Sequence, residues 1–324
     1  MRSAVLLQTN ARRGVGLTIG LVITGIALGM LARTVDWRLA LQYIRKVEWG
    51  WLSLAMAALL VNNAAKASRW RLLFPVDQEL PPRKDAFGSL MAGQLLNFLF
   101  PFRSGDISRI YFMGRYRGKS STATAGTIGA EKLLDLVIMG GLFILVIPYF
   151  VLPDWLESSK PSIWMVSLAA LSVWIGVMVA LPFSQGAVKK MAARWPILVW
   201  PVSVTLRLMD GFSALRHRQR LGPLLGWTAL VWIGSVGATW LLLQSLSLPA
   251  TLPLAILANV IVQGGLSVPV APAGIGVFEW LAILALAIGG VPTGQGLAYG
   301  LVTHAAVLFY PVLIGIPWLL TRFR

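Results

Sequence analysis

Long apolar runs separated by short, mostly basic stretches dominate this chain. A helix needs about 20 apolar residues to cross a bilayer. Runs of that kind occupy 14–32, 49–66, 122–151, 162–182, 222–246 and 296–320. Two further apolar regions, 86–102 and 254–291, are interrupted by helix-breaking glycine and proline. The pattern predicts an all-α polytopic membrane protein, a single integral membrane domain over residues 1–324, with about eight membrane segments including two broken or re-entrant elements.

Composition supports a membrane protein. Of the 324 residues, 57% are hydrophobic and only 12% are charged, whereas a soluble domain carries about 25% charged residues. The net charge of +16 does not indicate nucleic-acid binding, because the basic residues lie in short loops between apolar runs and not on one soluble face. Since the chain has no cysteine, disulfides, thiolate nucleophiles and Cys-ligated metals are excluded.

The distribution of charge predicts the orientation of the segments. Basic residues outnumber acidic residues clearly in 1–13, 66–119 and 183–220. The excess is smaller in 33–50, and in 152–161 acidic residues outnumber basic ones. Because cytoplasmic loops carry the excess of basic residues, both termini are expected to be cytoplasmic. The N-terminal run lacks an Ala-x-Ala exit and is interpreted as an uncleaved first span.

A shorter apolar segment lies in the second cytoplasmic stretch. Residues 195–206 are too few to cross a bilayer, and Lys189, Lys190, Arg194 and Arg207 flank them. The region 187–218 is therefore predicted to form a cytoplasmic helix lying in the membrane interface.

The same orientation predicts how the two broken regions enter the membrane. Basic residues lie on both sides of 86–102, so this segment is expected to enter from the cytoplasm and return. Region 254–291 approaches from the opposite face, and it either returns there or makes two short crossings. Two broken elements in corresponding positions of two halves indicate a transporter site.

Each broken region carries polar residues in a similar order. Candidate residues for substrate binding and translocation in the first half are Asn97, Arg103, Asp106, Arg109, Glu131, Lys132 and Asp135, and in the second half Asn259, Gln263, Glu279 and His304. Candidate hinge or turn residues are Pro101, Gly105, Pro269, Pro272, Gly274 and Gly276. A carboxylate inside a membrane is costly and usually marks a substrate or ion path. For Glu279, the only formal charge between Arg220 and Arg322, the alternative is a kinked span that holds the carboxylate near the headgroups.

The spacing of the charges predicts their pairing. Glu131 and Asp135 are four residues apart, so they share a helical face that must point inward. Their expected counter-ions are Arg103, Arg109 and Lys132, and the alternative role of this group is a structural ion-pair network. Glu279 has no counter-ion nearby in sequence, and its expected partner is Arg103 or a protonated His304. The two arginines could also simply contact anionic headgroups.

Four motifs in order resemble the flippase-like family of the lysylphosphatidylglycerol synthase transmembrane region. The matching residues are Asn97, Pro101, Arg103, Gly105, Asp106 and Arg109, then Glu131, Lys132 and Asp135, then Pro272, Gly274, Gly276 and Glu279, and finally Tyr310 and Pro311. The resemblance covers nearly the whole chain. Asp106 and Lys132 replace the family's usual Glu and Arg with conservation of charge, whereas His304 stands where an arginine is common, which puts a fixed Arg–Glu279 pair in doubt.

The resemblance implies a bacterial inner-membrane protein that translocates a lipid between leaflets. The basic residues favour a phospholipid or lipid-linked substrate with an anionic or phosphate-bearing headgroup. Because the chain ends at Arg324 directly after its last span, no aminoacyl-transferase domain and no lipid synthesis are expected. Membrane lipids are the expected partners, and a homo-oligomer is compatible with this interpretation.

Two other functions stay open. A membrane enzyme acting on a lipid phosphate or glycosyl carrier would need a nucleophile, a base or a metal. The sequence contains no Gly-x-Ser-x-Gly, His-Glu-x-x-His or P-loop motif, so neither enzyme activity nor a cofactor or metal is expected. The third function is a non-transporting partner of an envelope-lipid assembly that docks through the basic loop residues.

Overall fold

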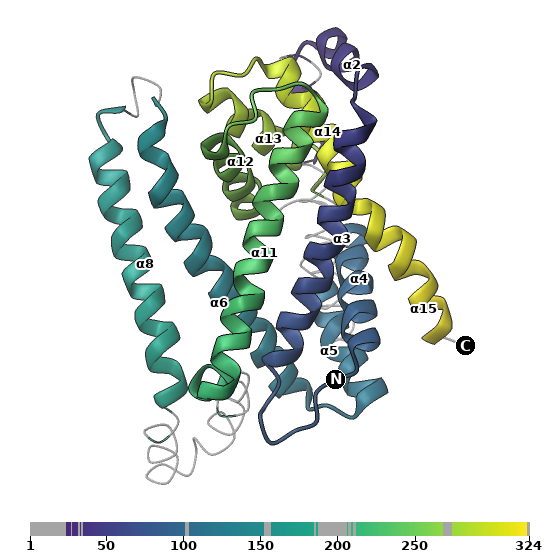
Figure 1. The fold of residues 1–324 in the computed structure, drawn as a ribbon, viewed down its shortest axis with the longest axis vertical. Helices are drawn as coiled ribbons and strands as arrows, with labels where there is room; N and C mark the ends of the chain where they lie inside the picture. The colour runs from purple at the N-terminus through teal and green to yellow at the C-terminus, as the bar shows by residue number, and fades with distance from the viewer. Residues whose placement is uncertain are drawn as a thin grey trace, which may run out of the picture.

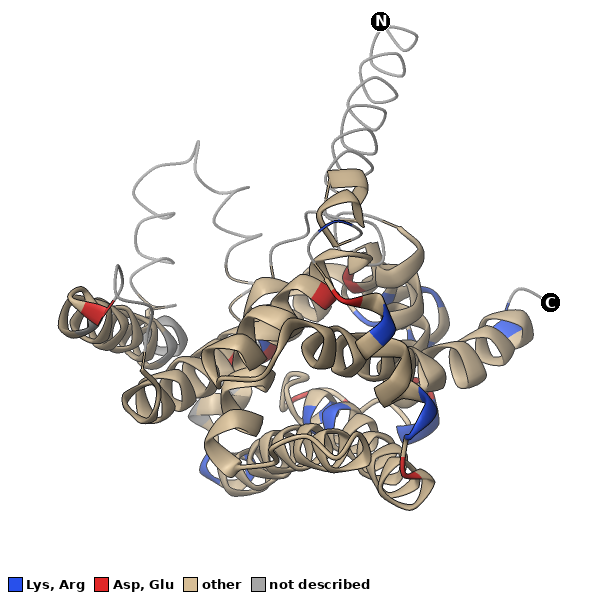
Figure 2. Ribbon diagram, turned by 90° about the horizontal axis from the view of Figure 1, so that it is seen from above, with Lys and Arg blue, Asp and Glu red and all other residues tan. Residues whose placement is uncertain are grey.

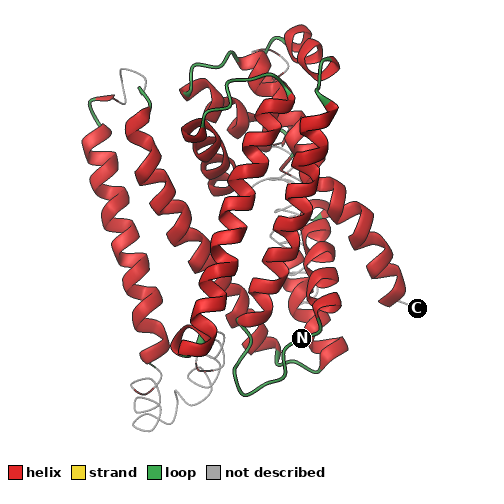
Figure 3. Cartoon of the chain, in the orientation of Figure 1, coloured by secondary structure: helices red, strands yellow, loops and turns green. Residues whose placement is uncertain are grey.

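The described part of the chain is entirely helical. The computed structural model describes residues 24–322 except Ala27, Ala32, Thr34, 101–103, 152–156, Gln185, 187–205, 207–208, 210–211 and 268–273. Within these residues no strand occurs (Figure 3), which confirms the predicted all-α fold for this part. The first predicted span, 14–32, and the predicted interfacial region, 187–218, lie largely outside the described residues.

The long helices fall on the predicted apolar runs, whereas two helices, Trp37–Arg45 and Ser104–Arg117, lie in stretches that were predicted to be basic loops. The first half contains α2 (Trp37–Arg45), α3 (Trp49–Leu72), α4 (Arg83–Leu99), α5 (Ser104–Arg117), α6 (Ser121–Val146), the 3-10 turn η1 (Ile147–Tyr149) and α8 (Lys160–Phe183). The second half contains the 3-10 turn η3 (Ser213–Arg216), α11 (Arg218–Ser245), α12 (Leu252–Gly265), α13 (Val277–Ile288), α14 (Thr293–Tyr310), the π-helical turn η5 (Pro311–Gly315) and α15 (Ile316–Arg322).

Helices α3 and α11 form an antiparallel pair at the centre of the bundle (Figure 1). At one end, the Glu48 N–H donates to the Ser245 carbonyl at 2.8 Å, so the start of α3 lies beside the end of α11. At the other end, the Arg220 guanidinium donates to the Phe74 carbonyl. Each of the two begins a series of four helices, in which two short helices lie between two long ones. The first series is α3, α4, α5 and α6, and the second is α11, α12, α13 and α14. The two series therefore run in opposite directions through the molecule.

The short helices form two pairs at opposite ends of the molecule. In Figure 1, α4 and α5 lie in the lower half, whereas α12 and α13 lie in the upper half. These helices have 17, 14, 14 and 12 residues. At 1.5 Å per residue, none of them is longer than about 26 Å, which is short of a hydrocarbon core of about 30 Å. Each pair is interrupted near its tip, at 101–103 and 268–273, outside the described residues.

Helix α5 is an addition to the prediction. The charge count placed residues 104–117 within a basic cytoplasmic stretch, but they form the helix that packs back along α4. Its buried positions are Gly105, Arg109, Phe112 and Met113, which recur at helical spacing. Because one of these positions is an arginine, a search for apolar runs does not detect the buried face.

Two helices in the described part of the chain are long and apolar enough to cross a membrane, Arg218–Ser245 and the continuous helix Thr293–Arg322. Helices α3 and α6 have similar lengths of 24 and 26 residues, but both carry charged residues along their length. Seen from above, few positions on the ribbons are Lys, Arg, Asp or Glu (Figure 2). Those charges that do occur inside the bundle are therefore distinctive.

Two glycines allow α4 and α5 to touch through their backbones. A Cβ atom on Gly105 would overlap the carbonyl group of Gly93, and a Cβ on Gly93 would lie 2.8 Å from Cγ of Arg109. The Gly105 N–H also donates to Asn97 Oδ1 at 2.8 Å. This close approach brings Arg109 onto the inner side of the pair.

Replacement of Gly105 by valine is expected to force α4 and α5 apart and to destabilise the fold by about 1–3 kcal/mol, the usual cost of overpacking. The matched control is Gly141→Ala in α6, where a new Cβ meets nothing within 4 Å. That change should be neutral or stabilising by up to about 1 kcal/mol through helix propensity. Thermal unfolding of the purified variants in detergent measures both effects, and equal melting temperatures would contradict the close packing.

Candidate functional site

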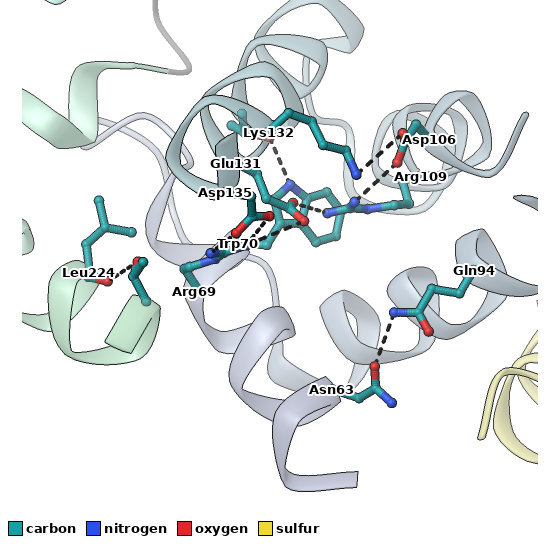
Figure 4. Close-up of polar contacts among 12 residues, drawn as sticks. Asn63, Arg69, Trp70, Gln94, Asp106, Arg109, Glu131, Lys132, Asp135 and Leu224 are labelled. Carbon is teal, nitrogen blue, oxygen red and sulfur yellow. Dashed lines mark hydrogen bonds and ion pairs between the residues drawn. The ribbon is translucent and has the colours of Figure 1, made fainter. Parts of the chain in front are cut away.

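A buried network of ion pairs joins α3, α5 and α6 (Figure 4). Arg69 on α3 donates two hydrogen bonds to the Asp135 carboxylate, at 2.6 and 2.9 Å, and also lies 3.9 Å from Glu131. Arg109 on α5 donates to Glu131 at 2.6 Å. The Arg69 side chain is 0% exposed and that of Glu131 is 5% exposed. Such charges are tolerated only when they are paired, so this network fixes the three helices relative to one another.

Further contacts hold Arg109 in place. Its guanidinium lies over the Trp70 ring, 4.0 Å from the ring centre, which is favourable for a cation. The Trp70 indole N–H donates to Thr127 at 2.9 Å. Asp106 lies 3.5 Å from Arg109 and 3.7 Å from the Lys132 ammonium. Lys132 is at the edge of the network, because 41% of its side chain is exposed.

The predicted pairing of the acids is right in part. Glu131 and Asp135 do face the same way, since both contact Arg69, and Arg109 is a counter-ion of Glu131 as predicted. Asp135 pairs with Arg69, and within the described residues it forms no ion pair with Arg109 or Lys132, the latter of which contacts Asp106. Arg69 went unrecognised because the span was predicted to end at residue 66, whereas α3 continues to Leu72. Arg103 lies outside the described residues.

Lys66 also belongs to this group of charges. It lines both polar hollows beside the network, and it makes no direct ion pair or hydrogen bond with any described residue. Four cations (Lys66, Arg69, Arg109 and Lys132) therefore face three acids (Asp106, Glu131 and Asp135), which leaves one positive charge in excess. Sequence reasoning counted Lys66 as a loop residue.

A cavity of about 350 Å³, lined by both polar and apolar side chains, lies beside the described ends of the two short pairs. Phe98 and Phe100 reach it from the end of α4, and Gly274 and Phe278 reach it from the start of α13. Its amide and hydroxyl lining comes from Asn62, Asn63, Gln94, Asn97, Ser235, Thr239, Asn259 and Gln263. A smaller hollow of about 130 Å³ adjoins it and is lined by residues of the ion network. The two share Lys66, Gln94, Asn97, Asp106, Lys132, Ser235 and Gln263.

The amides on the α12 side are fixed by hydrogen bonds to one another. Gln263 donates to Asn259 Oδ1 at 2.5 Å and to Ser235 Oγ at 3.1 Å. Asn259 donates to Thr239 Oγ1 at 3.0 Å. Across the cavity, Gln94 donates to Asn63 Oδ1 at 3.2 Å. These bonds hold the polar groups in place before any ligand binds, so little ordering is needed on binding.

Glu279 pairs with His304, one of its two predicted partners. His304 Nδ1 lies 2.6 Å from Glu279 Oε1, and the Gly276 N–H donates to the other carboxylate oxygen at 2.7 Å. Gly276 has φ +81° and Gly274 has φ +66°, so both turn positions favour glycine. Glu279 is only 5% exposed and is held between α13 and α14, so its carboxylate is enclosed by protein.

His304 connects the tips of both short pairs. Its ring stacks on Phe278 of α13, with centres 4.2 Å apart, and contacts Phe98 of α4 at 5.2 Å. His304 Nε2 is buried and has no hydrogen-bond partner within the described residues, and the residue lines the cavity. A ligand with a polar group could therefore satisfy this nitrogen.

The structure thus gathers most of the sequence-predicted site residues around one pair of connected hollows. Asn97, Asp106, Arg109, Glu131, Lys132, Asp135, Asn259, Gln263, Gly274 and His304 line them, and Glu279 lies directly behind His304. Pro101, Arg103, Pro269 and Pro272 lie outside the described residues.

Several residues of the site were not predicted from the sequence. They are Asn62, Asn63, Lys66, Arg69, Gln94, Ser235 and Thr239. The polar run Asn62-Asn63 with Lys66 inside apolar sequence was the available indication. In the part of the chain that the structure describes, no group of His, Asp and Glu side chains is arranged to hold a metal ion.

A helical bundle with a charged cavity and, within the described residues, two apolar helices of membrane-spanning length is the arrangement expected of an integral membrane protein. Residues 17–315 match the family described as the lysylphosphatidylglycerol synthase TM region, so the chain belongs to that family. Comparison with curated proteins and with solved structures gave no match. Family membership makes this a membrane protein involved in lipid handling.

Loss of the Glu131 charge should destabilise the protein strongly. Glu131→Gln removes the carboxylate 2.6 Å from Arg109 and leaves this arginine only the longer contact to Asp106 at 3.5 Å, and breaking a buried ion pair typically costs about 3–5 kcal/mol. The matched control is Glu79→Gln in an exposed loop, which should change stability by less than about 0.5 kcal/mol. Thermal unfolding in detergent measures both variants.

The companion test is a double-mutant cycle. If Arg109 and Glu131 form one unit, Arg109→Met combined with Glu131→Gln costs less than the sum of the two single changes. Additive effects would contradict direct coupling between these side chains.

Proposed function

We propose that this protein translocates a phospholipid or lipid-linked substrate with an anionic headgroup between the leaflets of the bacterial cytoplasmic membrane. The observation that carries the proposal is the cavity beside the ends of two oppositely directed short helix pairs, which is lined in part by amides, hydroxyls and Lys66, a cation that no described acid contacts directly. Membership of a lipid-handling family supports it. In the absence of a nucleotide-binding motif, transport would be downhill or coupled to an ion.

The proposed topology has six crossing segments and two re-entrant pairs. The loops 73–82 and 118–120 lie at one end of the molecule, and the loops 246–251 and 289–292 lie at the other (Figure 1). The first end carries the excess of lysine and arginine, and both termini are assigned to the cytoplasmic side with it. The pairs α4–α5 and α12–α13 then enter from the cytoplasm and from the opposite face, as in inverted-repeat transporters.

The excess positive charge explains why the substrate would be anionic. An unpaired ammonium in a region of low dielectric is costly, and a phosphate beside Lys66 would offset that cost with a charge-assisted hydrogen bond. The three acids cannot perform this role for Lys66, since the arginines and Lys132 already engage them. The fixed amides around the cavity would replace the water that a headgroup loses when it leaves the surface.

An enzyme acting on a lipid phosphate and a non-transporting assembly partner remain the alternatives. Product formation that depends on Asp135 would favour the enzyme. Wild-type behaviour of Glu279→Gln and Arg103→Ala variants would favour the assembly partner. Neither alternative requires a cavity that reaches the tips of both short pairs.

Lys66→Met should slow the exchange of a fluorescent phosphatidylglycerol between leaflets of reconstituted vesicles by at least about tenfold, equivalent to about 1.4 kcal/mol in the barrier. Lys66→Arg keeps the charge and should retain most of the rate. Lys84→Met makes the same chemical change at an exposed position and serves as the matched control.

Comparing the exchange of lipids with different headgroups tests the proposed preference for an anionic headgroup. Exchange of the zwitterionic phosphatidylcholine should respond less to Lys66→Met than exchange of phosphatidylglycerol does. Wild-type protein that accelerates no lipid, or a folded Lys66→Met variant that transports at the wild-type rate, would contradict the proposed role of the cavity.

A further inference from the structure

A second hollow, of about 520 Å³, lies on the side of the bundle between α6, α11 and α12. We call it the lateral groove. Every side chain that lines it is apolar, including Ile138 of α6, Trp232 of α11 and Ile256 of α12. Its rim is open to the surroundings, since Ile233 is 69% exposed and Leu252 is 60% exposed. In a membrane protein such a surface faces hydrocarbon.

The lateral groove and the polar hollow beside the ion network share a wall. Trp232 lines both of them. Its neighbour Ser235 faces the polar side, whereas Val236 faces the groove. Both hollows lie between α6 and α11, and the Trp232 indole lies at the boundary between the polar compartment and the apolar one.

The polar edge of that indole is unsatisfied. Trp232 is only 7% exposed, and its Nε1–H has no hydrogen-bond partner within the described residues. A buried donor without a partner is destabilising. By contrast, the N–H of Trp240 at the other end of the groove donates to the Ala250 carbonyl at 2.6 Å. The indole at the boundary between the two compartments thus carries one buried donor that the described residues leave unsatisfied.

The groove has depth because α11 has a glycine at its floor. A Cβ on Gly237 would meet nothing within 4 Å, whereas a Cβ on Gly234, one turn earlier, would meet Asn62 at 3.2 Å. The space at Gly237 is therefore not required for helix packing. A side chain placed there would project into the groove.

We propose that the lateral groove seats one hydrocarbon chain of the transported lipid while its headgroup occupies the polar cavity, an assignment that rests on the proposed function. Only an amphiphile matches an apolar compartment and a charged compartment that share one wall. The ester or phosphate oxygen at the junction of head and chain would accept the hydrogen bond from Trp232. Since lipid tails are as apolar as the groove, close packing and not the hydrophobic effect would favour the bound chain.

The experiment blocks the groove without touching the cavity. Gly237→Leu fills it, and Ile256→Trp narrows it from the opposite wall. Gly226→Leu is the matched control, because Gly226 lies on the same helix, outside the groove, and a Cβ there also meets nothing within 4 Å. Each variant is checked for an unchanged melting temperature in detergent.

Binding is measured with a phosphatidylglycerol that carries a diazirine in its acyl chain, added at low mole fraction to the purified full chain. After irradiation, mass spectrometry should find adducts concentrated on α11 and α12 residues of the groove. Gly237→Leu should reduce them at least tenfold, and Gly226→Leu should leave them unchanged. Leaflet exchange in vesicles should slow in Gly237→Leu and in Ile256→Trp, and it should be unchanged in Gly226→Leu.

The outcomes separate the two proposals. Groove adducts that Gly237→Leu abolishes, in a protein that exchanges no lipid, would support the groove and remove the proposed transport. Adducts spread evenly over the surface, or cross-links between two copies of the chain, would overturn the assignment of the groove. Transport at the wild-type rate by folded Gly237→Leu and Ile256→Trp would overturn it as well.

Discussion

The ion network between Arg69, Glu131 and Arg109 is the interaction on which the arrangement of the first half depends. It joins α3 to the consecutive helices α5 and α6, and its charges are almost entirely withdrawn from solvent. Isolated charges would be strongly unfavourable there, whereas a closed set of pairs is tolerated. The network therefore determines where α5 can lie against α3 and α6. The backbone contact of Gly93 with Gly105 then sets how close the returning helix comes to α4.

The second half of the chain also buries an acidic side chain, and it does so with fewer charged residues. Its single carboxylate, Glu279, is satisfied by the Gly276 N–H at the start of α13 and by His304 of α14. Since a histidine can be neutral, this half can hold its acid without adding a permanent positive charge. The Phe98 and Phe278 rings on His304 bring the tips of both pairs together. The cavity is therefore enclosed by an ionic site on one side and an aromatic site on the other.

The helices and much of the site could be predicted from the sequence because their causes are local. Apolar runs of membrane length identify α11 and α14, and the spacing of Glu131 and Asp135 places both on one face. The glycines before Glu279 indicate a turn that needs positive φ. The role of Lys66 and the Arg69–Asp135 pair were not accessible, because they arise from contacts between α3 and α6. Helix α5 was not predicted either, since its buried face includes Arg109. The desolvation cost of this arginine is offset by Glu131 of α6, a contact that exists only in the folded structure.

The excess positive charge at Lys66 is significant because the other charged side chains of this group are paired with one another. If Glu131 and Asp135 were unpaired, Lys66 could be neutralised by either, and the cavity would show no preference for an anion. Instead Arg69 and Arg109 engage both acids at 2.6 Å. Lys66 is then the cation of this group that no described carboxylate contacts directly, although Asp135 and Glu131 still act on it electrostatically. The pairs that fix α3, α5 and α6 thus also determine which charged side chain faces the cavity without a direct partner.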